Sequence, residues 1–109
     1  MDIHQILDEL GMAENDYLEL IHDFIEQLED GLNTISYNVD LNNFVQITKI
    51  ARMIRQTATS LKLQDIFDIT YQIELQAKSK SNLELIEQGV EELTRAFENL
   101  KEQYSFELV

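Results

Sequence analysis

Apolar residues recur at steps of three and four along most of this chain, which is the spacing of one face of an α-helix. Four long stretches show the pattern, over residues 17–35, 44–61, 63–77 and 83–100. The most regular of them consists of Phe44, Ile47, Ala51, Ile54, Ala58 and Leu61. The chain has no proline and only three glycines, so few helix breaks are obligatory. We therefore expect an all-α fold, an antiparallel up-and-down four-helix bundle with a short extra N-terminal helix.

A few residues indicate where these helices begin and end. A short apolar pattern over residues 2–10 predicts the N-terminal helix, which Gly11 should end. The first long pattern, over residues 17–35, breaks before Asp40, and we expect this residue to cap the N-terminus of the helix that follows. Ser81 and Glu84 have the spacing of a capping box, which predicts the start of the last helix there.

Charge and composition exclude several classes of function. The chain has 21 acidic and eight basic residues, a formal net charge of −13, which would repel nucleic acid and anionic membranes. It has no cysteine, so disulfides, thiolate catalysis and cysteine-ligated metals are excluded. No apolar run approaches the ~20 residues of a membrane span, and the acidic N-terminus is unlike a secretory signal. We expect a soluble, cytoplasmic protein that binds neither nucleic acid nor membrane.

The residues that could carry catalysis or hold a metal form no recognisable motif. No phosphate-binding loop, nucleophile elbow or catalytic-triad spacing is present. Acidic pairs such as Glu91-Glu92 are typical of solvated helix faces. His22 and Glu26 share one helix face, but two ligands rarely make a metal site. We therefore expect no enzymatic activity, no cofactor and no metal site.

Residues 51–63 read Ala-Arg-Met-Ile-Arg-Gln-Thr-Ala-Thr-Ser-Leu-Lys-Leu. This run resembles the active helix of histidine-containing phosphotransfer (HPt) domains, which usually reads A-H-x-L-K-G-S/A-A-x-x-L-G. The two align without a gap, and Arg52 stands where the phosphorylated histidine would be. The likeness covers roughly residues 14–104, and it includes Ile73-Glu74 at a position where the family commonly has Leu-Glu. The resemblance also helps to place a helix boundary near Ser60 to Lys62, and the chain length predicts a single domain over residues 1–109.

The resemblance also implies what the residues around Arg52 would do. In HPt domains the exposed histidine passes a phosphoryl group to and from receiver-domain aspartates. A lysine three residues later helps hold the phosphoryl oxygens, and the next residue is a glycine that lets the receiver approach. Here Arg55 would keep the charge of the lysine, Gln56 would not keep the space of the glycine, and Thr57 takes a small-residue position. A guanidinium is always protonated and has no lone pair to offer, so Arg52 cannot carry phosphate. The resemblance therefore implies an inactive, pseudo-HPt domain.

Basic residues gather on the helix that carries Arg52. Lys49, Arg52 and Arg55 are three residues apart and Lys62 follows near the helix end; we call these four the basic stripe. The stripe would either dock an acidic partner or pair with carboxylates of neighbouring helices, each pair contributing ~0.3–0.5 kcal/mol. The resemblance favours docking to a response-regulator receiver domain, whose phosphoacceptor aspartate lies among carboxylates, or to a histidine kinase. The residues expected to bind this partner are Lys49, Arg52, Arg55, Gln56, Thr59 and Lys62.

His22 offers a different phosphoacceptor, which would make the chain an active phosphocarrier. It lies beside the apolar pattern, between Ile21 and Asp23. A histidine at the edge of the core that satisfies a hydrogen bond is the simpler interpretation. His4 is expected on the surface of the first helix.

The first helix offers a third possibility. Its apolar stripe would mark a homodimer or partner interface if it were exposed. The chain would then be a helical scaffold or oligomerisation bundle unrelated to phosphorelay signalling. The preferred expectation is that this stripe packs over the end of the bundle. The stripe consists of Ile3, Ile6, Leu7 and Leu10.

Overall fold

The computed structural model describes residues 2–80 and 82–104, and these residues form five α-helices and no strand. The all-α class predicted from the sequence is confirmed. Each helix lies where an apolar pattern predicted one. In chain order the helices are α1 (Ile3–Leu10), α2 (Glu14–Asp40), α3 (Phe44–Ser60), α4 (Gln64–Ser79) and α5 (Leu83–Tyr104).

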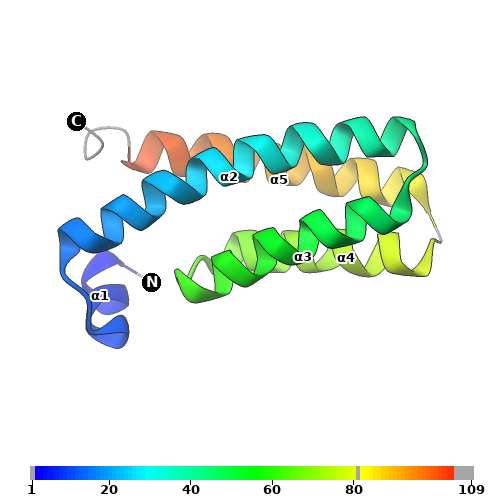
Figure 1. The fold of residues 1–109 in the computed structure, drawn as a ribbon. Coiled ribbons are helices and arrows are strands. Elements are labelled where there is room, and N and C mark those ends of the chain that lie inside the picture. Colours follow the sequence, from blue (N-terminus) through cyan, green and yellow to red (C-terminus); the bar gives the residue numbers. More distant parts are fainter. Residues whose placement is uncertain (1, 81, 105–109) are drawn as a thin grey trace.

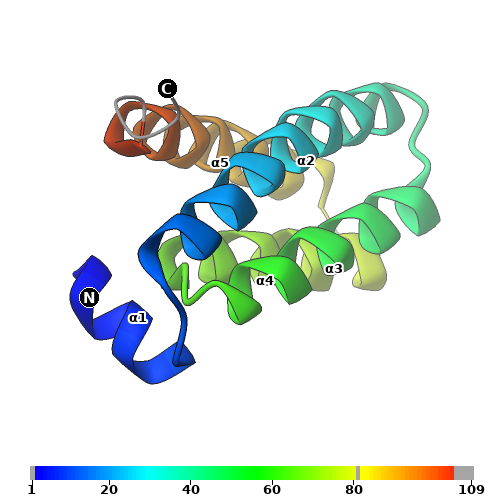
Figure 2. The same cartoon turned by 60° about the vertical axis from the view of Figure 1, so that its left-hand side comes forward.

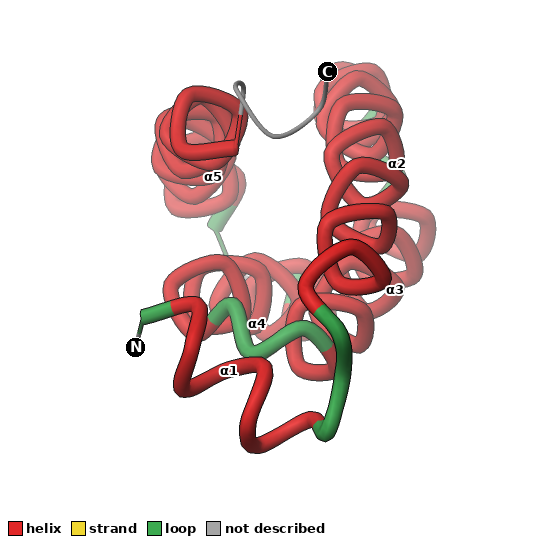
Figure 3. Tube along the Cα trace, turned by 90° about the vertical axis from the view of Figure 1, so that its left-hand side faces the viewer, coloured by secondary structure: helices red, strands yellow, loops and turns green. Residues whose placement is uncertain are grey.

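The four long helices, α2 to α5, lie side by side and run alternately in opposite directions (Figure 1). Each packs against the next along the chain, and α5 also packs against α2. Loops of three residues join successive long helices, which keeps neighbours in sequence close in space. Figure 3 looks along the helices and shows two layers, with α2 and α5 above α3 and α4.

The predicted apolar stripes face one another in one buried cluster. Tyr17 is fully buried with them, and its hydroxyl donates a hydrogen bond to the carbonyl of Leu61 at 2.7 Å. Burial, and then the neighbouring Tyr104, raises the pKa of Tyr17, so this phenol stays protonated and able to donate. The bond fixes the start of α2 against the α3–α4 loop. Core side chains less than 2% exposed include Ile21, Phe24, Leu28, Ile35, Ile47, Ile54, Ile73, Ile86 and Leu93.

The short helix α1 crosses one end of the long helices (Figure 2). Gly11 ends it as predicted, in the left-handed conformation at a φ of 61°. Ile6 is buried, and the rest of its apolar stripe is partly buried against the same core. This packing agrees with the preferred expectation that the stripe of α1 packs over the end of the long helices.

The end of α2 differs from the prediction. Helix α2 continues through Asp40, so Asp40 is its last residue and does not cap α3. That role belongs to Asn43, whose side chain accepts a hydrogen bond from the first turn of α3 at 3.3 Å. The helix continues because Val39 is buried in the core and the buried Asn38 is satisfied within α2. The packing of Val39 and Asn38 therefore extends α2 beyond the point at which the sequence pattern predicted its end.

The two remaining loops fall close to the predicted places. The α3–α4 turn occupies residues 61–63, with Lys62 in the left-handed conformation. Ser81, the predicted cap of α5, lies outside the described residues. The side chain of Asn82 accepts hydrogen bonds from the backbone N–H groups of Glu84 at 2.9 Å and Leu85 at 3.3 Å. A side-chain cap therefore begins α5, one residue later than predicted.

Two glycines lie where neighbouring helices approach closely: Gly31 between α2 and α3, and Gly89 between α5 and α4. A Cβ placed on Gly31 of α2 would lie 2.7 Å from Cδ1 of Ile54 on α3. A Cβ on Gly89 of α5 would lie 2.6 Å from Cγ1 of Ile73 on α4. Both distances are shorter than carbon–carbon contact, so the branched isoleucine fills the space that each glycine leaves. This packing explains why α2 tolerates a glycine in its interior.

The Gly31 contact predicts a coupling between two positions. Gly31→Ala should lower the free energy of unfolding by about 1–3 kcal/mol, because overpacking outweighs the gain in helix propensity. Ile54→Val alone should cost about 0.5–1.5 kcal/mol. The double variant should cost less than the sum by at least about 0.5 kcal/mol, since valine lacks the clashing Cδ1. Urea denaturation of the four proteins measures this, and strict additivity would contradict the contact.

Candidate functional site

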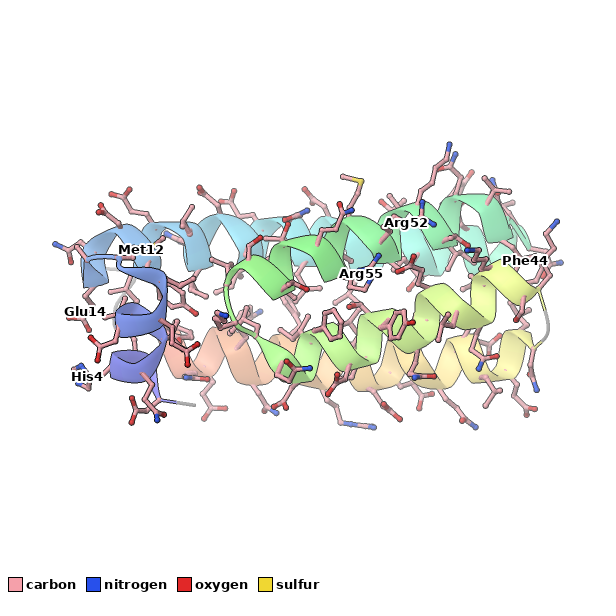
Figure 4. All side chains as sticks on the ribbon, turned by 90° about the horizontal axis from the view of Figure 1, so that it is seen from below. His4, Met12, Glu14, Phe44, Arg52 and Arg55 are labelled. Carbon is pink, nitrogen blue, oxygen red and sulfur yellow. The ribbon has the colours of Figure 1, made fainter. Side chains whose placement is uncertain are left out.

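Arg52, Arg55 and Glu74 form an ion cluster across the α3–α4 boundary. Nε of Arg52 donates to Oε2 of Glu74 at 3.0 Å, and Nε of Arg55 donates to Oε1 at 2.5 Å. A longer contact of 3.5 Å joins Nη2 of Arg55 to Oε2. Figure 4 shows the two arginines on α3, on the side that α4 approaches. Both carboxylate oxygens are thus occupied, and one acidic group holds both guanidinium groups.

The sequence produces this cluster because each member directly follows a core residue. Arg52 follows Ala51, Arg55 follows Ile54 and Glu74 follows Ile73. One step along a helix rotates a side chain by about 100°, from the core to the edge of the helix. Because α3 and α4 are antiparallel neighbours, these edges meet.

Glu74 is the most enclosed member of the cluster. Its side chain is 8% exposed, compared with 24% for Arg55 and 44% for Arg52. Burial alone would raise the pKa of Glu74, but hydrogen bonds from Arg55 and Arg52, and their charges, hold the pKa below its usual value. The carboxylate is therefore ionised at neutral pH, and the cluster carries a formal charge of +1.

Aromatic rings support Arg55 from α4. Its guanidinium carbon lies 5.7 Å from the centre of the Tyr71 ring, within the range of a cation–π contact. Tyr71 in turn stacks on Phe67, with ring centres 5.9 Å apart. Arg55 is thus held by both an acid and an aromatic ring of α4.

The four residues of the basic stripe do not share one partner. Arg52 and Arg55 pair with Glu74, whereas Lys62 lies in the α3–α4 turn and pairs with Glu9 of α1 at 3.6 Å. Lys49 is exposed and has no ion pair with the described residues. The pairing of stripe residues with neighbouring carboxylates, one of the two predicted alternatives, is therefore present at three of four positions.

The two uncharged residues predicted for the site lie on the outer side of α3. Thr59 is exposed and donates its hydroxyl to the carbonyl of Arg55 at 3.0 Å. Gln56 is exposed and lines a shallow hollow of about 330 Å³ between α2 and α3. Leu20 and Phe24 form part of its wall. Gln56 thus borders α2, and it follows Arg52 by about one turn on the same side of α3.

Glu74 is the member of the ion cluster that the sequence analysis did not assign to the site. It appeared only as one letter of the family resemblance. A usable signal was present, because an acidic residue directly follows a core position in the α4 pattern. Such a residue lies at a helix edge, where a cation of the adjacent helix can reach it.

The two histidines and the candidate metal pair remain separate from this cluster. His4 and His22 are exposed, and no hydrogen bond links either ring to the described residues. The hydrogen bond expected for His22 is therefore not found. No group of three or more histidine, aspartate or glutamate side chains in the described ranges is placed to hold a metal ion.

No protein-family model, no curated protein and no solved structure matches this chain. Among residues 2–80 and 82–104, no helix combines the length and the apolar character needed to cross a bilayer.

The pairing of Glu74 predicts a stability that depends on pH. Glu74→Gln should lower the free energy of unfolding at neutral pH by about 1.5–3 kcal/mol, the range for hydrogen bonds to charged groups. The folded pKa lies below the usual value of 4.5, so the contribution of the carboxylate is complete above that value. It should disappear as the pH falls through the folded pKa. The difference between wild type and variant should therefore shrink in acid.

Urea denaturation at neutral pH and at several lower pH values measures this difference. Glu92→Gln, which removes an exposed carboxylate of α5, is the matched control and should change stability little. Equal stability of wild type and Glu74→Gln at neutral pH would contradict the assigned role.

Proposed function

We propose that this chain is a pseudo-HPt signalling module. In this proposal α2 to α5 form the antiparallel up-and-down four-helix bundle of that family, with α1 as an additional N-terminal helix. The module binds a receiver domain or a histidine kinase of a two-component system and transfers no phosphate. The order and short connections of the helices, together with the gapless resemblance around Arg52, support this assignment.

The observation that carries the proposal is the state of Arg52. This residue occupies the phosphohistidine position, yet its guanidinium has no lone pair to attack a phosphoryl group. Its Nε is bound to Glu74, and this is its only hydrogen bond to the described residues. The side chain remains 44% exposed. Arg52 is therefore a fixed, accessible cation where the family has a nucleophile.

The mechanism we propose is competition. A receiver domain has carboxylates around its phosphoacceptor aspartate, and these would accept hydrogen bonds from the Nη groups of Arg52. The module would occupy the surface that a phosphotransfer partner needs, without passing phosphate on. Because Glu74 already orients the guanidinium, less side-chain entropy is lost on binding. Gln56, also exposed on α3, takes the place of a glycine that would allow closer approach.

This function predicts a charge-dependent interaction through Arg52. Receiver domains of the same genome would be titrated with the full chain, unphosphorylated and phosphorylated, at low and moderate salt. We expect salt-sensitive binding to at least one of them. Arg52→Glu should raise its dissociation constant at least about tenfold, because it replaces attraction by repulsion.

Two further variants make the comparison specific. Arg95→Glu changes the same charge on the exposed face of α5 and should alter the dissociation constant less than about twofold. Arg52→Gln tests the charge without placing a second carboxylate beside Glu74. Binding that is unchanged in both Arg52 variants would contradict the proposed contact, and binding to no receiver would contradict docking to a receiver domain.

A further inference from the structure

Charge is divided unequally between the two layers of the molecule. Residues 44–80, which contain α3 and α4, include six of the eight basic residues and three of the 21 acidic ones, a formal charge of +3. The rest of the chain contains the other two basic and 18 acidic residues, a formal charge of −16. Figure 3 shows α3 and α4 together in one layer and α2 and α5 in the other, with the short helix α1 crossing the end of the α3–α4 layer. An anionic partner is therefore repelled from most directions and attracted from one.

The outer surface of this basic layer also exposes apolar side chains. On α3, Val45, Lys49 and Arg52 are spaced by four and three residues and therefore lie in one row. On α4, Tyr71, Leu75 and Lys78 have the same spacing and form a second row. Val45, Tyr71 and Leu75 are 56%, 41% and 40% exposed. Three cations lie among them, at Lys49, Arg52 and Lys78. We call these six residues the α3–α4 outer face.

The acidic residues of the basic layer do not cancel its charge at this face. Glu74 is enclosed between Arg52 and Arg55 and presents little carboxylate to solvent. Asp65 and Asp68 lie in the first two turns of α4, at the end away from Lys78. Asp68 accepts a hydrogen bond from Gln64 at 2.9 Å. Lys49 and Lys78 have no ion pair with the described residues, so both are available to a partner.

We infer that the α3–α4 outer face is a docking surface for an acidic amphipathic helix of a partner protein. Apolar side chains of that helix would cover Val45, Tyr71 and Leu75, and its carboxylates would meet the three cations. The seam between two antiparallel helices suits a third helix that contacts it at every third and fourth residue. The inference deepens the proposed function and rests on it, because it names the side of Arg52 from which the partner approaches. The acidic α2–α5 layer would exclude the same partner from the opposite side.

A synthetic helical peptide tests the inference without a natural partner. The probe has leucines at every third and fourth position and glutamates on both flanks. A second peptide with glutamine in place of glutamate is its control. We expect the acidic peptide to bind the full chain in a salt-dependent way and to shift NMR amide signals of α3 and α4. The glutamine peptide should bind at least about tenfold more weakly, since only the charges differ.

Charge-reversal variants locate the surface. The double variant Lys49→Glu with Lys78→Glu should raise the dissociation constant of the acidic peptide at least about tenfold. Arg95→Glu with Lys101→Glu makes the same change of net charge on α5 and should have less than about a twofold effect. All four side chains lie outside the core, so circular dichroism should show folded protein in each case.

The outcomes separate this inference from the proposed function. Equal losses in the two double variants, signal changes confined to α2 and α5, or no binding of the acidic peptide would overturn the docking surface. Binding to anionic lipid vesicles in place of the peptide would overturn it as well. If the peptide binds as expected but neither a receiver domain nor a histidine kinase does, the docking surface stands and the proposed function fails. If a receiver binds through α2 while the peptide does not bind, the proposed function stands and the docking surface fails.

Discussion

The carboxylate of Glu74, enclosed between two guanidinium groups, is the interaction on which the α3–α4 layer depends. Burying a single charge is costly, and it is tolerated here because both oxygens accept hydrogen bonds from arginine. The carboxylate in turn removes the repulsion that two arginines one turn apart would otherwise create. It also orients Arg52 at the position where the resembling family has its histidine. One acidic residue therefore links the edges of α3 and α4 and orients the cation of the candidate site.

The same pairing explains how a strongly acidic chain keeps a basic surface. The net charge of −13 would favour carboxylates on every exposed face, yet the acidic residues concentrate on α1, α2 and α5. In the α3–α4 layer Glu74 is enclosed between Arg52 and Arg55. The charge on the exposed surface near it therefore comes from Arg52 and the nearby lysines. A partner of matching charge would be oriented before contact is made. Orientation by long-range charge and fixation by a preformed guanidinium are complementary parts of the proposed binding.

Much of the fold follows from the sequence, and the site follows only in part. The periodicity of residues such as Ile47, Ile54 and Ile73 predicts the helices, because burial of one helix face leaves a pattern in one dimension. The predicted end of α2 was wrong. Whether Asp40 or Asn43 caps α3 depends on whether Val39 is buried in the core, and periodicity does not show this. Arg52 and Arg55 were identified from the family resemblance together with their spacing on one helix. Their partner Glu74 was not, because it lies on a different helix and periodicity does not pair helix edges.

The most direct test of this account is an NMR titration of the Glu74 carboxyl carbon in the full chain. In the wild type the midpoint should lie below the usual 4.5, because the arginines outweigh burial. In Arg55→Gln the midpoint should rise, since burial then opposes ionisation with one charged partner fewer. A wild-type midpoint at or above 4.5, or one that does not move in Arg55→Gln, would contradict the account. Either result would mean that Glu74 does not hold the arginines in place.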